Sequence, residues 1–164
     1  MSFVLDSSCL IYLGKLKVLD KLKHIEGNKY IPEEVYNEVI KNGYSRGEPE
    51  VKYIENLIKT NELTIKNPKE RLENYGKLSL ADVDVISLAK EIKAVAIIDD
   101  NEASLLAEFN EVDYHGSIYL LILLMNKKVI SKHDALKYID EMISLGFYLS
   151  IEVYKELREK LNNI

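Results

Sequence analysis

Three aspartates directly follow apolar stretches that are typical of buried strands. Asp99 and Asp100 come after the apolar run at 94–98. Asp6 ends a shorter apolar run that begins at Phe3. The carboxyl ends of parallel strands meet at one edge of a sheet, and open parallel sheets bind their ligands there. We therefore expect these carboxylates to share an edge, where they could hold a cation.

Two further acids lie near the starts of predicted helices. In the segment 32–39 (PEEVYNEV), Glu38 borders the apolar face of the helix. In the helix predicted over 80–93, Asp82 lies at the edge of the inward-facing stripe, whereas Asp84 lies further toward solvent. Both aspartates are in the first turn, where the helix dipole favours negative charge. We favour Asp82 over Asp84 as the acid that faces the site.

A cluster of carboxylates favours particular cations and a particular reaction. Several carboxylates in one place repel one another, at a cost of several kcal/mol unless a cation compensates. Sites built from oxygen ligands alone select hard ions such as Mg²⁺ or Mn²⁺ over zinc. Metal-held water can attack a phosphodiester while the ions stabilise the attacking and leaving oxygens. The acids therefore indicate metal-dependent phosphodiester hydrolysis.

Each acid also has a purely structural interpretation. Asp82 lies three residues after Ser79 and can complete a capping box. Asp6 can cap the first helix, and either aspartate of the adjacent pair can cap the helix that follows it. Glu38 can be an ordinary solvated carboxylate. Taken together these interpretations are weaker, because two strand ends and two helix starts would then supply acids by coincidence.

The composition suits one globular domain with a single core. The chain has 164 residues, of which 47% are hydrophobic and 30% charged. The lone cysteine, Cys9, excludes an internal disulfide and a cysteine-rich zinc site. The apolar run at 120–125 (LLILLM) is far shorter than the roughly 18 residues of a membrane span, and the N-terminus lacks a signal-peptide pattern. We expect a cytoplasmic protein with no membrane partner.

The net charge of −5 argues against a nucleic-acid partner, because phosphates are attracted by positive potential. Divalent cations bound to the acids would offset this charge locally. Predicted loops also carry the basic residues Lys66, Lys69, Arg71 and Lys77. Most of these form an ordinary solvated surface, and one or two near the sheet edge could grip phosphates.

Short apolar runs alternate with helical periodicity along the chain. We expect strands over 3–6, 29–31, 63–65, 94–98 and 112–114. Helices are predicted over 7–13 (with Ser7 and Ser8 as caps), 15–25, 32–41, 50–59, 80–93, 101–109, 117–124, 132–144 and 151–161, with a loop at 43–49. This alternation predicts an α/β fold, a three-layer sandwich with a central parallel sheet, in a single domain over 1–164.

The order of four stretches resembles the PIN-domain nuclease family, which includes the VapC-type toxins. These stretches are VLDSS (4–8), P-x-x-V-x-x-E-V (32–39), LSLADVDVISLA (78–89) and AIIDDNEA (96–103). The chain is most similar to a prokaryotic PIN-like subfamily, which has a similar tail of the type HGSIYLLILLMNKKVI (115–130). No single motif is stringent, and the specificity lies in their order and spacing.

The resemblance implies a PIN-like sandwich and a set of site residues. The catalytic acids would be Asp6, Glu38, Asp82 and Asp100, with Asp99 as a further metal ligand, Mg²⁺ or Mn²⁺ as the cofactor, and Ser8 holding water or a ligand. Many members carry Thr-x-Asp where this chain has Ile98-Asp99-Asp100, so a hydroxyl is lost and a carboxylate gained. Asp84 competes with Asp82, because relatives often carry acids at both places.

The resulting hypothesis is a metal-dependent endoribonuclease that hydrolyses RNA phosphodiester bonds, as the toxin of a toxin–antitoxin pair. The resemblance further implies a homodimer and a small antitoxin protein that blocks the acidic site. An alternative is a catalytically weak PIN-fold module that binds RNA or a protein. A third, weaker alternative is a phosphatase acting on small monoesters.

Overall fold

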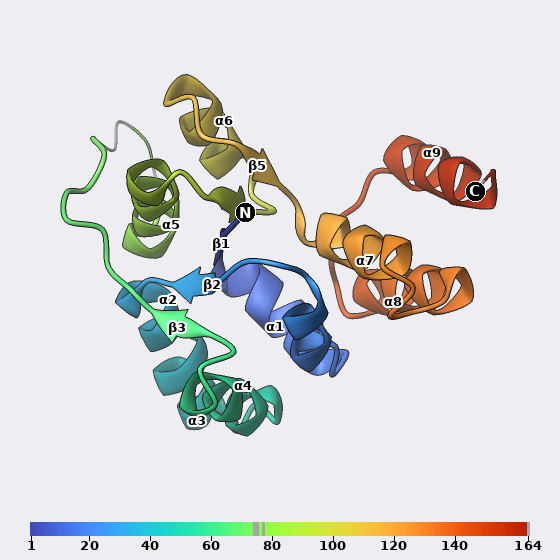
Figure 1. Cartoon of the computed structure of the whole chain (residues 1–164), viewed down its shortest axis with the longest axis horizontal. Helices are drawn as coiled ribbons and strands as arrows, with labels where there is room; N and C mark the ends of the chain where they lie inside the picture. The colour runs from blue at the N-terminus through green and yellow to red at the C-terminus, as the bar shows by residue number, and fades with distance from the viewer. Residues whose placement is uncertain (74–75, 77, 164) are drawn as a thin grey trace.

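The described residues form a five-stranded, entirely parallel sheet at the centre of the molecule (Figure 1). The computed structural model describes residues 1–73, 76 and 78–163, and Lys77 lies outside them. The strands are β1 (Phe3–Leu5), β2 (Lys29–Ile31), β3 (Thr64–Ile65), β4 (Val95–Ile97) and β5 (Tyr114–His115), in the spatial order β3-β2-β1-β4-β5. The predicted central parallel sheet is confirmed.

Strand β1 lies in the middle of the sheet, and Phe3 is in register with both Lys29 of β2 and Val95 of β4. All three residues of β1 and of β4 are buried. Strands covered by helices on both faces read as continuous apolar runs rather than alternating ones. This explains why the runs FVL and VAI are legible in the sequence as strands.

Helices cover both faces of the sheet and complete the predicted three-layer sandwich (Figure 1). On one side lie α5 (Leu80–Ile92) and α6 (Asn101–Phe109), and on the other α1 (Ser7–Lys15) and α7 (Ser117–Asn126). The remaining helices are the 3₁₀ helix η1 (Leu19–His24), α2 (Glu33–Tyr36), the π-helical turn η2 (Asn37–Lys41), α3 (Asn42–Arg46), α4 (Glu50–Lys59), α8 (Lys132–Ser144) and α9 (Ile151–Asn162).

Two predicted elements are wrong. The helix expected over 15–25 is instead the end of α1 followed by the 3₁₀ helix η1, because Lys17 adopts a left-handed backbone (φ 55°) that interrupts the α-helix. The loop expected at 43–49 is helical as far as Arg46, and the turn comes at Gly47, which has φ 70°. Gly43 is needed for packing rather than for a turn, since a Cβ there would meet Val51 Cγ2 at 2.4 Å.

Helix caps follow the local sequence. The predicted capping of α1 by Ser7 and Ser8 is wrong, because Asp6 is the N-cap and accepts the Cys9 amide. Ser79 caps α5 as predicted, and its Oγ accepts the amide of Asp82 at 3.1 Å. Asp100 caps α6. The capping interpretations of Asp6 and Asp100 are therefore correct, and the Asp82 side chain accepts the Ser79 hydroxyl.

The apolar run at 120–125 belongs to α7 and is largely buried against the core. Cys9 is also fully buried, as its apolar neighbours in the sequence predict. Over residues 1–73, 76 and 78–163, no helix combines the length and the apolar character that a bilayer span requires.

Candidate active site

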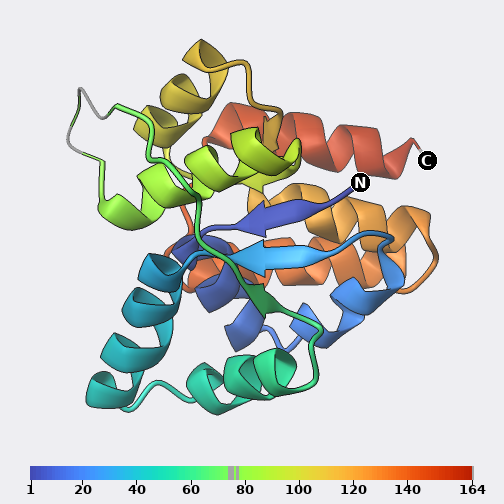
Figure 2. The ribbon, with the colours of Figure 1, turned by 60° about the vertical axis from the view of Figure 1, so that its left-hand side comes forward.

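The sheet has a switch point between β1 and β4. From β1 the chain first adds β2 and β3 on one side and later adds β4 and β5 on the other. Ligands of open parallel sheets bind outside the carboxyl ends of the strands at such a point, where the flanking connections leave in opposite directions. Asp6 follows β1 and Asp99 lies two residues after β4, so both belong to this edge. Figure 2 shows the arrowheads of β1 and β2 pointing to the same side of the molecule.

Asp6 is the most deeply buried acid of the edge, with 3% of its surface exposed. Its Oδ1 accepts the Cys9 amide at 2.7 Å, and its Oδ2 accepts the Asp99 amide at 3.2 Å. Burial and the neighbouring charge of Asp99, with a smaller contribution from Asp82, raise the pKa of Asp6 to about 8. Without a cation, this carboxyl group is therefore largely protonated at neutral pH.

Asp99 is held in place by Ser117, the first residue of α7. The Ser117 amide donates to Asp99 Oδ1 at 2.7 Å, and the Ser117 hydroxyl donates to Oδ2 at 2.5 Å. The Ser8 hydroxyl also hydrogen-bonds this carboxylate. Burial raises the pKa of Asp99, and the bonds from Ser117 and Ser8 oppose that rise. Asp99 is thus oriented by hydrogen bonds on both of its oxygens.

The structure corrects the prediction about the two aspartates of α5. Asp84, expected to lie toward solvent, is 2% exposed, whereas Asp82 is only half-buried. Helix α5 is buried on nearly all sides from Val83 to Ala89, so it has no single inward stripe. Arg71 covers Asp84 with two hydrogen bonds, from Nε at 2.6 Å and from Nη2 at 3.0 Å.

Asp82 keeps its place near the acidic edge. It accepts the Ser79 hydroxyl at 2.8 Å, in the first turn of α5, and its charge contributes to the raised pKa of Asp6. Of the two aspartates of α5, Asp82 therefore contributes its charge to the edge. Asp84 is instead paired with Arg71.

Glu38 and Asp100 are exposed and bind local partners. Glu38 accepts the Ser7 hydroxyl at 2.6 Å, which brings it to the first turn of α1, next to Asp6 in sequence. Asp100 accepts the Ala103 amide at 2.9 Å as the cap of α6. Of the adjacent aspartates after β4, it is Asp99 that contacts Asp6.

The donor atoms fit a hard divalent cation. Over residues 1–73, 76 and 78–163, no group of three or more Asp, Glu, His or Cys side chains is close enough together to hold a metal. Mg²⁺ keeps several of its waters and is usually held by only one or two carboxylates. Asp6, which is buried, and Asp99, which is half-buried, offer such oxygen ligands, and burial raises the pKa of both carboxyls.

Two residues after β5, Gly116 and Ser117, border the Asp99 carboxylate and were not predicted from the sequence. A Cβ on Gly116 would lie 3.0 Å from Asp99 Oδ1, so glycine leaves room for the carboxylate. The signal was present in the sequence, because the pair follows a predicted strand. Neither residue type is acidic, so a search for carboxylates passes over them.

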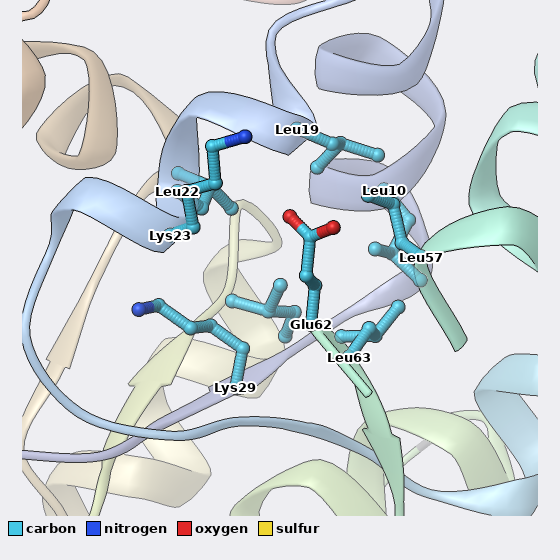
Figure 3. Close-up of a pocket in the computed structure, with 9 residues that line it drawn as sticks. Leu10, Leu19, Leu22, Lys23, Lys29, Leu57, Glu62 and Leu63 are labelled. Atoms are coloured by element: carbon cyan, nitrogen blue, oxygen red, sulfur yellow. The ribbon is translucent and has the colours of Figure 1, made fainter. Parts of the chain in front are cut away.

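A small hollow, drawn in Figure 3, lies in the apolar core. It lies between α1, η1 and the residues before β3 and has about 10 Å³ of room, the size of one water molecule. Leucines line most of it, and the Glu62 carboxylate points into it with Oε2 unpartnered. Lys29 Nζ donates to the carbonyls of Ile25 and Gly27. The hollow is too small for a substrate.

The fold and the edge define an α/β protein with an acidic pair, a buried Asp6 and a half-buried Asp99, at the switch point of its sheet. The family model DUF3368, described as a PIN domain, matches residues 2–163. The chain therefore belongs to this family of PIN domains, and the predicted resemblance is confirmed.

One solved structure agrees with this assignment at the level of the fold. A PilT N-terminus domain protein from the hyperthermophilic archaeon Sulfolobus solfataricus P2 is 17% identical, with a TM-score of 0.55, over 74% of this chain and 92% of that chain. A domain of a functionally unknown protein from Methanocaldococcus jannaschii DSM 2661 is 16% identical, with a TM-score of 0.48, over 71% of this chain and 91% of that chain. Among curated proteins, no relative matches the chain.

PIN domains are a nuclease fold: they are generally hydrolases and typically use divalent metal ions. The chain therefore has the architecture of a nuclease, with acids at the edge where parallel sheets bind their ligands.

Proposed function

We propose that the protein is a metal-dependent endoribonuclease that hydrolyses RNA phosphodiester bonds with Mg²⁺ or Mn²⁺. The observation that carries this proposal is the hydrogen bond from the Asp99 amide to the buried Asp6 carboxylate at the switch point of a PIN-domain sheet. Two neighbouring carboxylates, one buried and one half-buried, are unfavourable as a structural device alone, because their mutual repulsion must be relieved by a proton or by a cation.

Asp6 and Asp99 are the proposed ligands, and the bound cation would supply an activated water and charge stabilisation for the phosphodiester. Asp6 and Asp99 would hold the cation, and Asp6 would have to give up its proton to do so. Ser117 and Ser8 hold Asp99 in one orientation, so that its oxygens remain aimed at the edge.

Glu38 and Asp82 are proposed to hold the waters of the cation and thereby the attacking nucleophile. Each already accepts a serine hydroxyl, Glu38 from Ser7 and Asp82 from Ser79, so each is oriented before any substrate arrives. The family resemblance favours Asp100 as the fourth acid, but we propose Asp99 instead, because it contacts Asp6 through its amide and is less exposed than Asp100. We assign Asp100 to the helix cap.

The test is cleavage of a panel of single-stranded and structured RNAs by purified protein with Mn²⁺. We expect cuts that EDTA abolishes and that Asp6→Asn abolishes. Asp113→Asn is the matched control, because Asp113 is an exposed aspartate just before β5, at the opposite edge of the sheet. A rise in melting temperature with Mn²⁺, present in the wild type and absent in Asp6→Asn, is a second readout that needs no turnover.

Other outcomes would point to the alternatives. RNA binding that ignores both EDTA and Asp6→Asn, without any cleavage, would favour the binding module. Release of phosphate from small monoesters without RNA cleavage would favour a phosphatase.

The toxin role is a further part of the proposal. It predicts that expression of the wild type arrests growth of a bacterial host, that Asp6→Asn does not, and that a small protein encoded beside the gene restores growth. Arrest that persists with Asp6→Asn would contradict it. A homodimer is proposed from the resemblance alone and predicts twice the monomer mass in light scattering.

A further inference from the structure

Arg71 forms an unusual ion pair with an acid that the proposed mechanism does not use. Asp84 is 2% exposed, and the Arg71 side chain that binds it is 49% exposed. The guanidinium uses Nε and Nη2 toward Asp84, in the paired geometry that fixes its plane. Nη2 also lies 3.7 Å from Glu34 Oε1, so the guanidinium has a second acidic neighbour, and half of the side chain faces solvent. Arg71 is thus an oriented, solvent-facing donor.

The segment that carries Arg71 is pinned along the acidic edge. Beyond the end of β3, the Lys66 amide donates to the Ile31 carbonyl at 2.9 Å. Asn67 exchanges two hydrogen bonds with Glu33 at the start of α2. Further along, the Leu72 amide donates to the Ser87 hydroxyl of α5 at 2.9 Å. The segment, which follows β3 in Figure 2, is therefore a strap that hydrogen bonds hold at both ends.

The strap lies on the same edge as Asp6 and Asp99. All strands are parallel, so the residues after β3, at the start of α2 and after β1 share one side of the sheet. Asp84, which holds Arg71, lies two residues after Asp82, whose charge reaches Asp6. Between the strap, α2 and α5 is an open surface hollow of about 460 Å³, lined by Arg71 and Lys69 and by the acids Glu33, Glu34 and Asp84.

We propose that Arg71 binds a phosphate of single-stranded RNA beside the scissile bond, and that Asp84 is the residue that positions it. This inference rests on the proposed function and adds a substrate contact to it. A planar guanidinium with one edge fixed by a carboxylate presents its other donors to a phosphate in a defined direction, which a lysine cannot do. The position explains how a chain with a net charge of −5 can hold RNA next to its acids.

The experiment measures the affinity for a fluorescent single-stranded RNA against salt concentration, by anisotropy, in the uncleaving Asp6→Asn background. Arg71→Gln alone leaves Asp84 buried without its partner and endangers the fold. The main variant is therefore the double change Arg71→Gln with Asp84→Asn, in which two amides replace the ion pair. Its melting temperature is compared with that of the background protein before binding is measured.

We expect the double variant to bind about tenfold more weakly, the effect of one charge-assisted hydrogen bond. The slope of log K against log salt should become shallower by about 0.7, the value for one lost phosphate contact on a single strand. Arg71→Lys should keep the slope but lose affinity. Asp84→Asn should also keep the slope and lose affinity, because Arg71 is then no longer oriented.

Arg46→Gln is the matched control. Arg46 is exposed and ends the helical run that starts at Glu33, about 20 Å further from the edge. We expect the slope of log K against log salt for Arg46→Gln to equal that of the background protein.

Two results would overturn the inference. An unchanged slope in the double variant, with RNA cleavage by the wild type intact, would remove the phosphate contact and leave the proposed function standing. Affinity in Asp84→Asn equal to or tighter than the background would remove the positioning role. RNA that neither binds to the background protein nor is cut by the wild type would overturn this inference and the proposed function together.

Discussion

The peptide N–H of Asp99 donates a hydrogen bond to Oδ2 of Asp6 at 3.2 Å, across 93 residues of sequence. This bond connects the end of β4 to the end of β1 and keeps the carboxyl groups of Asp6 and Asp99 close to each other. Its acceptor is a side chain and its donor is backbone, so Asp99 can change its own side chain without losing the bond. The two acids can therefore be tested separately.

Asp99 and Asp100 should respond differently to the same change. Asp99→Asn is expected to lower Mn²⁺-dependent RNA cleavage by more than about a hundredfold, because it removes a ligand. Asp100→Asn should leave both cleavage and melting temperature nearly unchanged, since asparagine caps a helix as well as aspartate does. Cleavage rates and thermal melts of both variants check this, and loss of cleavage in Asp100→Asn alone would return the ligand role to Asp100.

Ser117→Ala should weaken metal binding without touching a ligand. The variant loses the 2.5 Å bond from the hydroxyl to Asp99 Oδ2 but keeps the amide bond to Oδ1. Removal of a partner that orients a ligand typically costs 10–100-fold in metal affinity. Titration calorimetry with Mn²⁺ measures it, with Ser131→Ala as the control, a helix cap of α8 remote from the edge in sequence. Unchanged affinity would show that the amide alone orients Asp99.

Gly116→Ala should impair activity more than stability. The backbone at Gly116 has φ −82°, which any residue adopts, so the only effect is the contact of the new Cβ with Asp99 Oδ1 at 3.0 Å. We expect about tenfold lower metal affinity and a loss of stability below about 1 kcal/mol. Gly47→Ala makes the opposite control: its φ of 70° should cost about 1 kcal/mol with no effect on cleavage.

Metal affinity should rise with pH up to about 8. Asp6 binds a proton below its raised pKa of about 8, and the cation must displace that proton. At pH 7, calorimetry in buffers of different ionisation enthalpy should show close to one proton released per Mn²⁺ bound. The release should disappear in Asp6→Asn, and a wild type that releases no proton at pH 7 would contradict the raised pKa.

The metal-free protein should lose stability as the pH rises. The folded-state pKa of Asp6 is about 8 and its ordinary value is 3.8, so between these values the folded state binds the extra proton. The contribution of Asp6 to the free energy of unfolding is therefore largest below pH 3.8 and is lost as the pH rises toward 8. Denaturant titrations in EDTA at pH 5 and pH 8 measure it. Asp6→Asn should flatten the dependence, and Mn²⁺ should reverse it at pH 8.

Much of the fold is predictable because its causes are local. The elements at 29–31, 50–59, 101–109 and 132–144 match their predicted bounds to the residue. Buried strands are recognisable in the sequence as apolar runs, and helices as periodic apolar stripes that follow a capping residue. The errors arose where the backbone departed from the usual meaning of a residue type: at Lys17, which is left-handed without being glycine, and at Gly43, which packs a helix rather than ending one.

The candidate site also has a part that the sequence predicts and a part that it does not. The sequence by itself determined that acids follow β1 and β4 and begin α5, because strand ends and helix starts are legible locally. Only the tertiary structure decided that Asp99 rather than Asp100 meets Asp6, that Asp84 is taken by Arg71, and that Ser117 orients the pair. The physical reason is distance along the chain. These contacts join residues between 13 and 93 positions apart, so the packing of whole elements sets them and no local pattern records them.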